Sequence, residues 1–149
     1  MVRFLYIPII MKVSIYSKSE LYKMLETGGL SSNVAIISFA DEGCEFLEFP
    51  SNIDHMKVEF DDIRPSNITK ERLEELLPEA PLIAYFIHQR IKEGKDIICQ
   101  CDYGLSRSAG LAAAILERYG HMGIQVFQDY RYTPSQIVYN KVYDELKKL

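Results

Sequence analysis

The sequence has 149 residues, of which 48% are hydrophobic and 26% charged, and this composition predicts one globular domain over residues 1–149. Its formal net charge of −4 argues against nucleic-acid binding and against a membrane-surface role, because both need an excess of basic residues. Two of the 3 cysteines are separated by a single residue, which indicates reduced thiols in a cytoplasmic protein and not a disulfide framework.

The first ten residues are mostly apolar, but they are too short for a secretory signal and lack its cleavage site. We expect residues 1–10 to extend the edge of a sheet or to hang loose. No stretch approaches the ~18 apolar residues that a membrane-spanning helix needs, so no membrane contact is expected.

Apolar runs and their spacing predict the elements of the first half of the chain. A short strand is expected over residues 12–16 and a helix over 19–26, which a glycine pair ends. The continuous apolar run 34–39 has the length of a strand that is buried on both faces. Residues 45–48 are expected to form a short strand, and the alternation over 56–60 predicts another.

The second half of the chain reads mainly as helices around one strand. Helices are expected over residues 69–77, 81–92, 107–119 and 124–129, with a last helix ending at Leu149, and a strand over 95–100. The order of all these elements predicts an α/β fold with a central, mainly parallel sheet of four to five strands flanked by helices.

The stretch from Ile97 to Ser108 joins that strand to the most apolar helix. Between Cys101 and Arg107 the backbone must curl, and Gly104 supplies the freedom in φ that a curl needs. Successive N–H groups then point at one centre, where the helix that begins near Arg107 adds its own unpaired N–H groups and its dipole. These groups favour a bound dianion and the thiolate form of Cys101.

The residues that open the helix add two further functions to this loop. Arg107 can direct two N–H donors at two phosphate oxygens, a planar geometry that lysine lacks. Ser108 lies close enough along the chain to donate its hydroxyl hydrogen to the sulfur of Cys101. The sequence therefore predicts a reactive cysteine beneath a phosphate-binding loop, which consists of Asp102, Tyr103, Gly104, Leu105, Ser106 and Arg107.

An acidic pair, Asp61-Asp62, directly follows the strand expected over 56–60. Expelling an alkoxide or phenoxide from a phosphate ester needs a proton donor, and a carboxylic acid on a mobile loop can supply it. Val58 and Phe60 share one face of the strand, so Asp62 continues on that face and Asp61 points away. The alternation favours Asp62 as the acid and leaves Asp61, or a solvated acidic turn, as alternatives.

Residues 101–108 are similar to the C-x5-R signature loop of cysteine-dependent protein tyrosine phosphatases, in the form with glycine third after cysteine and serine after arginine. Phe60-Asp61-Asp62 resembles the acid loop of the compact tyrosine and dual-specificity members. Residues 130–134 resemble the arginine-proline turn before the family's last helix, and the likeness spans about residues 58–149. The resemblance implies a protein tyrosine phosphatase-like fold in its compact, dual-specificity-like form.

The resemblance also implies an activity, the hydrolysis of a phosphomonoester through a cysteinyl-phosphate intermediate. Cys101 attacks phosphorus while Asp62 protonates the leaving oxygen, and Asp62 then activates water. No metal and no cofactor are called for. The expected partner is a phosphorylated protein or a small phosphomonoester; phosphotyrosine, phosphoserine or phosphothreonine, and non-protein phosphates all fit the sequence.

Three positions depart from the family pattern. Gln100 stands where most members have histidine, Tyr103 replaces a small residue, and Ser135-Gln136 follows the late proline where many members have asparagine. Tyr103 either narrows the pocket, stacks on a substrate ring or packs against neighbouring helices. The departures keep two alternatives open, a catalytically weak phosphate-binding pseudophosphatase and another oxyanion or sulfur-transfer enzyme on the same loop.

Overall fold

The computed structural model describes residues 3–7 and 11–149, which form a five-stranded sheet with helices on both faces. The strands lie in the order β1-β2-β5-β3-β4. Their bounds are β1 Arg3–Ile7, β2 Met11–Ser17, β3 Val34–Ala40, β4 Asp54–Glu59 and β5 Asp96–Cys101. Strands β2 to β5 run parallel to their neighbours, and only β1 pairs antiparallel, with β2. The predicted α/β fold with a mainly parallel sheet is therefore confirmed.

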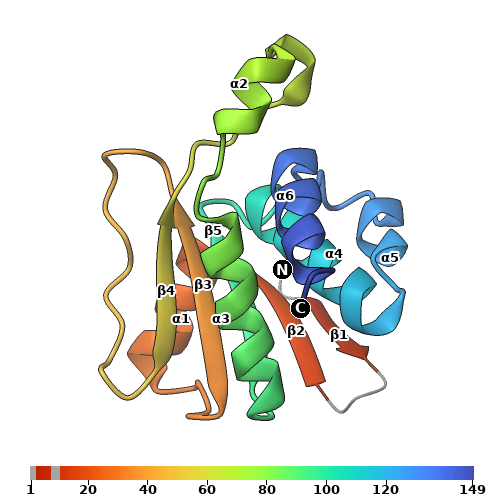
Figure 1. Cartoon of the computed structure of the whole chain (residues 1–149). Helices are drawn as coiled ribbons and strands as arrows, with labels where there is room; N and C mark the ends of the chain where they lie inside the picture. Colours follow the sequence, from red (N-terminus) through yellow and green to blue (C-terminus); the bar gives the residue numbers. More distant parts are fainter. Residues whose placement is uncertain (1–2, 8–10) are drawn as a thin grey trace.

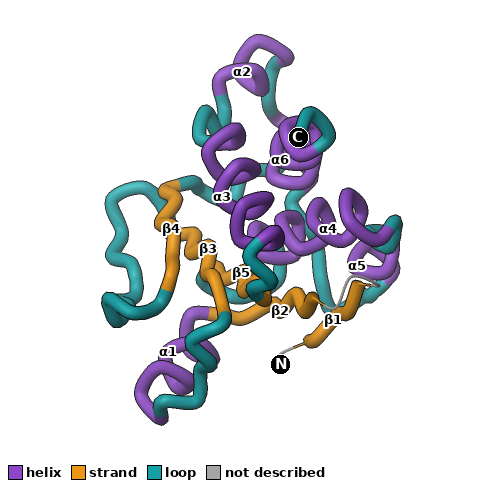
Figure 2. Tube along the Cα trace, turned by 60° about the horizontal axis from the view of Figure 1, so that its bottom comes forward, coloured by secondary structure: helices purple, strands orange, loops and turns teal. Residues whose placement is uncertain are grey.

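The helices form two unequal layers. Their bounds are α1 Lys18–Thr27, α2 Lys70–Glu75, α3 Ala80–Lys92, α4 Arg107–Gly120, α5 Ile124–Gln128 and α6 Gln136–Leu146. Figure 2 shows α1 on one side of the sheet and α3, α4 and α6 on the other. No helix in the described part of the chain is long and apolar enough to cross a membrane.

The alternation of side chains along β3 explains why the sheet carries a core on each face. Ala35, Ile37 and Phe39 point into the larger core beneath α3, α4 and α6. Val34 and Ile36 point into the smaller core beneath α1. All seven residues of β3 are buried, because a central parallel strand is covered from both sides.

One predicted strand is wrong and one prediction falls partly outside the described residues. Residues 45–48 form no strand but part of a loop that returns the chain from β3 to the start of the parallel strand β4 (Figure 1). Leu47 and Ile53 of this loop pack into the smaller core, so burial of side chains replaces strand pairing there. Of the N-terminal ten, residues 3–7 form β1 at the sheet edge, and 1–2 and 8–10 lie outside the described residues.

Helix α4 crosses the interior of the larger core. Every residue from Arg107 to Leu116 is buried, and Leu111, Ile115 and Leu116 are among the largest fully buried side chains. The helix contacts α5 and α6 as well as the sheet. Its N-terminus is therefore fixed at the carboxyl end of β5, the position that the site requires.

Helix α2 lies on an arm that projects from the body of the molecule (Figure 1). The arm begins with a 3-10 turn over Pro65–Asn67 and is tied to α6 by a hydrogen bond from Lys141 Nζ to the carbonyl oxygen of Glu74 at 3.2 Å. The acidic pair precedes this arm in sequence.

We predict that Leu111→Ala lowers the free energy of unfolding by about 2–5 kcal/mol, because Leu111 is fully buried and a cavity remains where its side chain packed. Leu82→Ala is the matched control, since Leu82 is 64% exposed on α3. Urea denaturation followed by circular dichroism measures both. Equal losses for the two variants would contradict the assignment of α4 to the core.

Candidate active site

Three carbonyl groups of the loop between β5 and α4 are hydrogen-bonded to neighbouring segments of the chain. The carbonyl oxygen of Asp102 accepts from the N–H of Lys18 at 3.1 Å, and that of Leu105 accepts from Thr133 at 2.9 Å. The carbonyl oxygen of Ser106 accepts from Ser135 at 3.0 Å. By contrast, no hydrogen bond within the described chain takes up the backbone N–H groups of residues 102–107. These groups are available to an oxyanion.

Gly104 is required by both conformation and space. Its φ of +70° lies in the left-handed region, which favours glycine. A Cβ atom at this position would lie 2.7 Å from the backbone nitrogen of Ser17 and 2.9 Å from the carbonyl carbon of Tyr16. The loop therefore packs directly on the end of β2, with no room for a side chain.

Cys101 lies at the end of β5, where its side chain is 2% exposed. Its sulfur is 3.1 Å from the hydroxyl oxygen of Ser108, which is fully buried on the first turn of α4. Cys99, two residues earlier, points into the larger core, and burial raises the pKa of its thiol far above the ordinary value. Cys99 is thus an inert core thiol.

The guanidinium of Arg107 is buried, and its three nitrogens differ in their hydrogen bonding. Its Nη1 donates to Asp41 Oδ1 at 2.7 Å and to the carbonyl oxygen of Phe60 at 2.6 Å. Its Nη2 lies 3.7 Å from Asp102 Oδ2, and its Nε is buried without a partner in the described chain. One nitrogen is thus anchored to the scaffold, while Nε is an unsatisfied donor and Nη2 has only a long ion pair.

The two acidic residues after β4 face in different directions. Asp62 Oδ1 accepts a hydrogen bond from the hydroxyl of Ser106 at 2.7 Å, so its carboxylate lies at the cysteine loop. Asp61 Oδ1 accepts from the backbone N–H of Glu42 at 2.8 Å, so it ties the loop after β3 to the acid loop. Of the pair, only Asp62 contacts the predicted phosphate-binding loop in this structure.

Gln100 lies on the opposite face of β5 from Cys101. Its side-chain oxygen accepts a hydrogen bond from the hydroxyl of Ser38, and both residues are 1% exposed. Tyr16 is paired with Gln100 in the sheet, and burial, followed by the charge of Glu20, raises the pKa of its hydroxyl. The residue that precedes Cys101 thus carries a neutral amide, whereas a histidine at this position would carry a titratable imidazole.

Tyr103 does not pack against neighbouring helices, since it is 82% exposed. It lines a groove of about 710 Å³ together with Asp102, Lys18, Tyr22 and Leu47. This groove opens at the start of the cysteine loop. Tyr103 is therefore accessible to a molecule that binds at the start of the cysteine loop.

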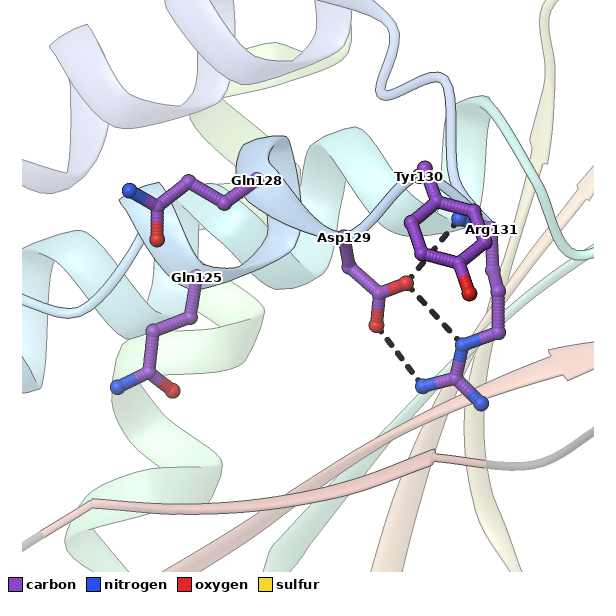
Figure 3. A pocket seen from close by; sticks show the side chains of 5 residues that line it. All are labelled: Gln125, Gln128, Asp129, Tyr130 and Arg131. Atoms are coloured by element: carbon purple, nitrogen blue, oxygen red, sulfur yellow. Dashed lines mark hydrogen bonds and ion pairs between the residues drawn. The ribbon is translucent and has the colours of Figure 1, made fainter.

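Two polar residues of the turn before α6, Ser135 and Arg131, are engaged in contacts that stabilise the turn. The hydroxyl of Ser135 caps α6 by accepting from the N–H of Val138 at 3.2 Å. Arg131 is held by Asp129, whose carboxylate receives its Nε at 3.1 Å and its Nη2 at 2.8 Å (Figure 3). Tyr130 between them is exposed in the surface pocket that the figure shows. Arg131 is thus committed to an ion pair beside this pocket.

Sequence reasoning missed two partners of Arg107, Asp41 and the carbonyl group of Phe60. Asp41 follows β3 and lies 66 positions before Arg107, so no local sequence pattern predicts the contact. The position of Asp41 directly after a predicted strand could have indicated the contact, because the carboxyl ends of neighbouring parallel strands meet at one edge of the sheet. Among the described residues, no group of three or more His, Cys, Asp and Glu is arranged to hold a metal ion.

We predict that Gly104→Ala lowers the affinity for vanadate or sulfate at least about tenfold, because the added Cβ collides with β2 and displaces the loop. Gly43→Ala is the control, since Gly43 has a φ of +79° but open space around its Cβ position. Isothermal titration of each folded variant measures the affinity. Equal affinities for Gly104→Ala and the wild type would show that the loop does not bind the anion.

No family model matches the sequence, and no curated relative matches it. Solved structures do match the fold. Human DUSP28 superposes with a TM-score of 0.63 at 12% identity, over 97% of this chain and 93% of that one. A human tyrosine phosphatase-like serine/threonine/tyrosine-interacting protein gives a TM-score of 0.58 at 16% identity, over 92% and 93%.

Tk-PTP in its active form gives a TM-score of 0.58 at 15% identity, over 98% of this chain and 97% of that one. The likeness extends over nearly the whole length of each protein. The chain therefore has the fold of the compact tyrosine and dual-specificity protein phosphatases.

Proposed function

We propose that the protein is a cysteine-dependent phosphatase that hydrolyses phosphotyrosine in proteins and accepts other phosphomonoesters. The observation that carries this proposal is the state of Arg107. Its guanidinium is 4% exposed, and its Nε makes no hydrogen bond with a described residue, so a bound oxyanion would satisfy a donor that the described chain leaves open. The free N–H groups of residues 102–107 lie in the same loop, so a tetrahedral dianion satisfies both sets of donors.

In the first step, the thiolate of Cys101 attacks phosphorus and the bond between phosphorus and the ester oxygen breaks. Asp62, protonated, gives its proton to the departing oxygen. Arg107 Nε and Nη2, with the loop N–H groups, bind the three equatorial oxygens as charge redistributes. The product is a cysteinyl-phosphate on Cys101 and a free hydroxyl on the leaving group.

In the second step, water attacks the cysteinyl-phosphate and the bond between phosphorus and sulfur breaks. Asp62, now a carboxylate, takes the proton from water, which regenerates the acid for the next cycle. The hydroxyl of Ser108, 3.1 Å from the sulfur, donates to the thiolate as it departs. Inorganic phosphate then leaves the loop.

We predict that Cys101→Ser abolishes turnover of p-nitrophenyl phosphate, because the serine hydroxyl is not ionised at neutral pH. Cys44→Ser is the matched control, since Cys44 is an exposed cysteine outside the loop. Release of p-nitrophenol measures both variants. Wild-type turnover by Cys101→Ser would contradict the proposed nucleophile, and vanadate binding by a wild type without turnover would favour the pseudophosphatase.

We predict that Asp62→Asn lowers kcat about 10²–10⁴-fold for phosphotyrosine peptides, because the leaving oxygen loses its proton donor. Asp61→Asn is the matched control and should keep kcat near the wild-type value, because Asp61 accepts a hydrogen bond from the backbone of Glu42 and makes none with the cysteine loop. Steady-state kinetics with the same peptide measure both variants. A large loss of kcat in Asp61→Asn with none in Asp62→Asn would reverse the assignment.

A further inference from the structure

A polar groove lies beside the cysteine loop, on the side of the acid loop. Its volume is about 280 Å³, and it is lined by Asp62, Arg64, Ser66, Ser106, Thr133 and Gln136, among others. We call it the Arg64 groove. Ser106 belongs both to this groove and to the cysteine loop, so a ligand whose phosphate occupies the loop reaches the groove with its neighbouring groups.

Arg64 differs from the other arginines whose side chains the structure describes. Each of those others has a partner: Arg72 pairs with Glu75, Arg90 with Asp54, Arg107 with Asp41, Arg131 with Asp129, and Arg118 with the carbonyl oxygens of Leu146 and Leu149. Arg64 forms no ion pair or hydrogen bond with any described residue. In a chain with net charge −4, an unpaired guanidinium in a groove beside the site is a binding feature for an anion.

The other groups around the groove also suit an anion. The hydroxyls of Ser66 and Thr133 and the side-chain amide of Gln136 make no hydrogen bond with described residues. The N-terminus of α6, 11 residues long, opens here at Gln136 and adds the positive end of its dipole. Asp62 is the one carboxylate that lines the groove, and the proposed reaction requires it to be protonated when substrate binds.

A second groove meets the opposite end of the cysteine loop. Tyr22, Leu47 and Tyr103 give it aromatic and apolar walls, and its polar walls come from Ser17, Lys18, Ser19 and Asp102; we call it the aromatic groove. Grooves at both ends of the loop suit an extended chain that presents its phosphate at the middle. A peptide meets this requirement, with one flank in the aromatic groove and the other in the Arg64 groove.

We infer that the Arg64 groove is a specificity site for an anionic group on a phosphopeptide substrate. The anion is a glutamate or aspartate side chain, or a second phosphorylated residue, one or two positions from the phosphotyrosine. Arg64 pairs with it, and the free hydroxyl and amide donors complete its hydrogen bonding. This inference rests on the proposed phosphatase activity and adds the sequence context that the enzyme selects.

Phosphotyrosine peptides that carry either Glu or Gln at one flanking position test the inference, with all four positions within two residues scanned. For the wild type we expect kcat/KM about two- to fivefold higher for the Glu peptide at one or more positions, the effect of an exposed charge pair. Arg64→Ala should bring the ratio to about one, and Arg64→Glu should reverse it in favour of a Lys peptide. Arg72→Ala, an arginine on the same arm, should keep the wild-type ratio.

A companion series with phosphothreonine at the flanking positions distinguishes a second phosphate from a carboxylate as the preferred anion. A wild type that hydrolyses the Glu, Gln and phosphothreonine peptides equally at all positions overturns the inference and leaves the proposed function intact. So does a preference that Arg64→Ala retains. A wild type that hydrolyses no phosphopeptide contradicts both the proposed function and the inference.

Discussion

The structure around Cys101 depends on the hydrogen bonds that hold the guanidinium of Arg107 in place. Arg107 Nη1 is fixed by Asp41 and by the carbonyl oxygen of Phe60, which lie at the ends of β3 and β4. The first helical residue of α4 thus joins two neighbouring strands at their carboxyl ends. Because one nitrogen is anchored, the orientation of the whole planar group is set, and with it the positions of Nε and Nη2.

The same contacts couple the loops that the proposed reaction uses. Phe60 directly precedes Asp61 and Asp62, so the bond from Arg107 to its carbonyl oxygen fixes the point where the acid loop leaves the sheet. Asp61 holds the loop after β3, and Asp62 reaches Ser106. Beyond Asp62 the chain continues into the projecting arm that carries α2. The acid loop is therefore anchored to the sheet at its first residues, next to Phe60.

Much of the fold followed from local patterns. The strand, loop and helix around Cys101 were predictable, because the apolar run, Gly104 and the apolar helix each have a local signature. The strand expected over 45–48 was wrong, since Leu47 packs into the smaller core while its backbone pairs with no strand. The alternation of apolar and polar residues shows which side chains are buried. It does not show whether the backbone finds a neighbouring strand with which to pair.

The contacts that complete the site were less accessible to sequence reasoning. The bond between Asp41 and Arg107 spans 66 positions, and the bond between Ser106 and Asp62 spans 44. The divergence of Asp61 and Asp62 agrees with the alternation along β4, but their partners, Glu42 and Ser106, depend on loop conformation. The exposure of Tyr103 likewise depends on the space between α1 and the loop after β3.

The central claim is that Cys101 takes the phosphoryl group from the substrate, and trapping the intermediate tests it most directly. The protein is mixed with an aryl phosphate, quenched in acid within milliseconds and analysed by mass spectrometry of its peptides. We expect one added phosphoryl group on the peptide that contains Cys101, and none on the corresponding peptide of Cys101→Ser. Steady turnover with no phosphorylated Cys101, or with the phosphoryl group on another residue, would contradict it.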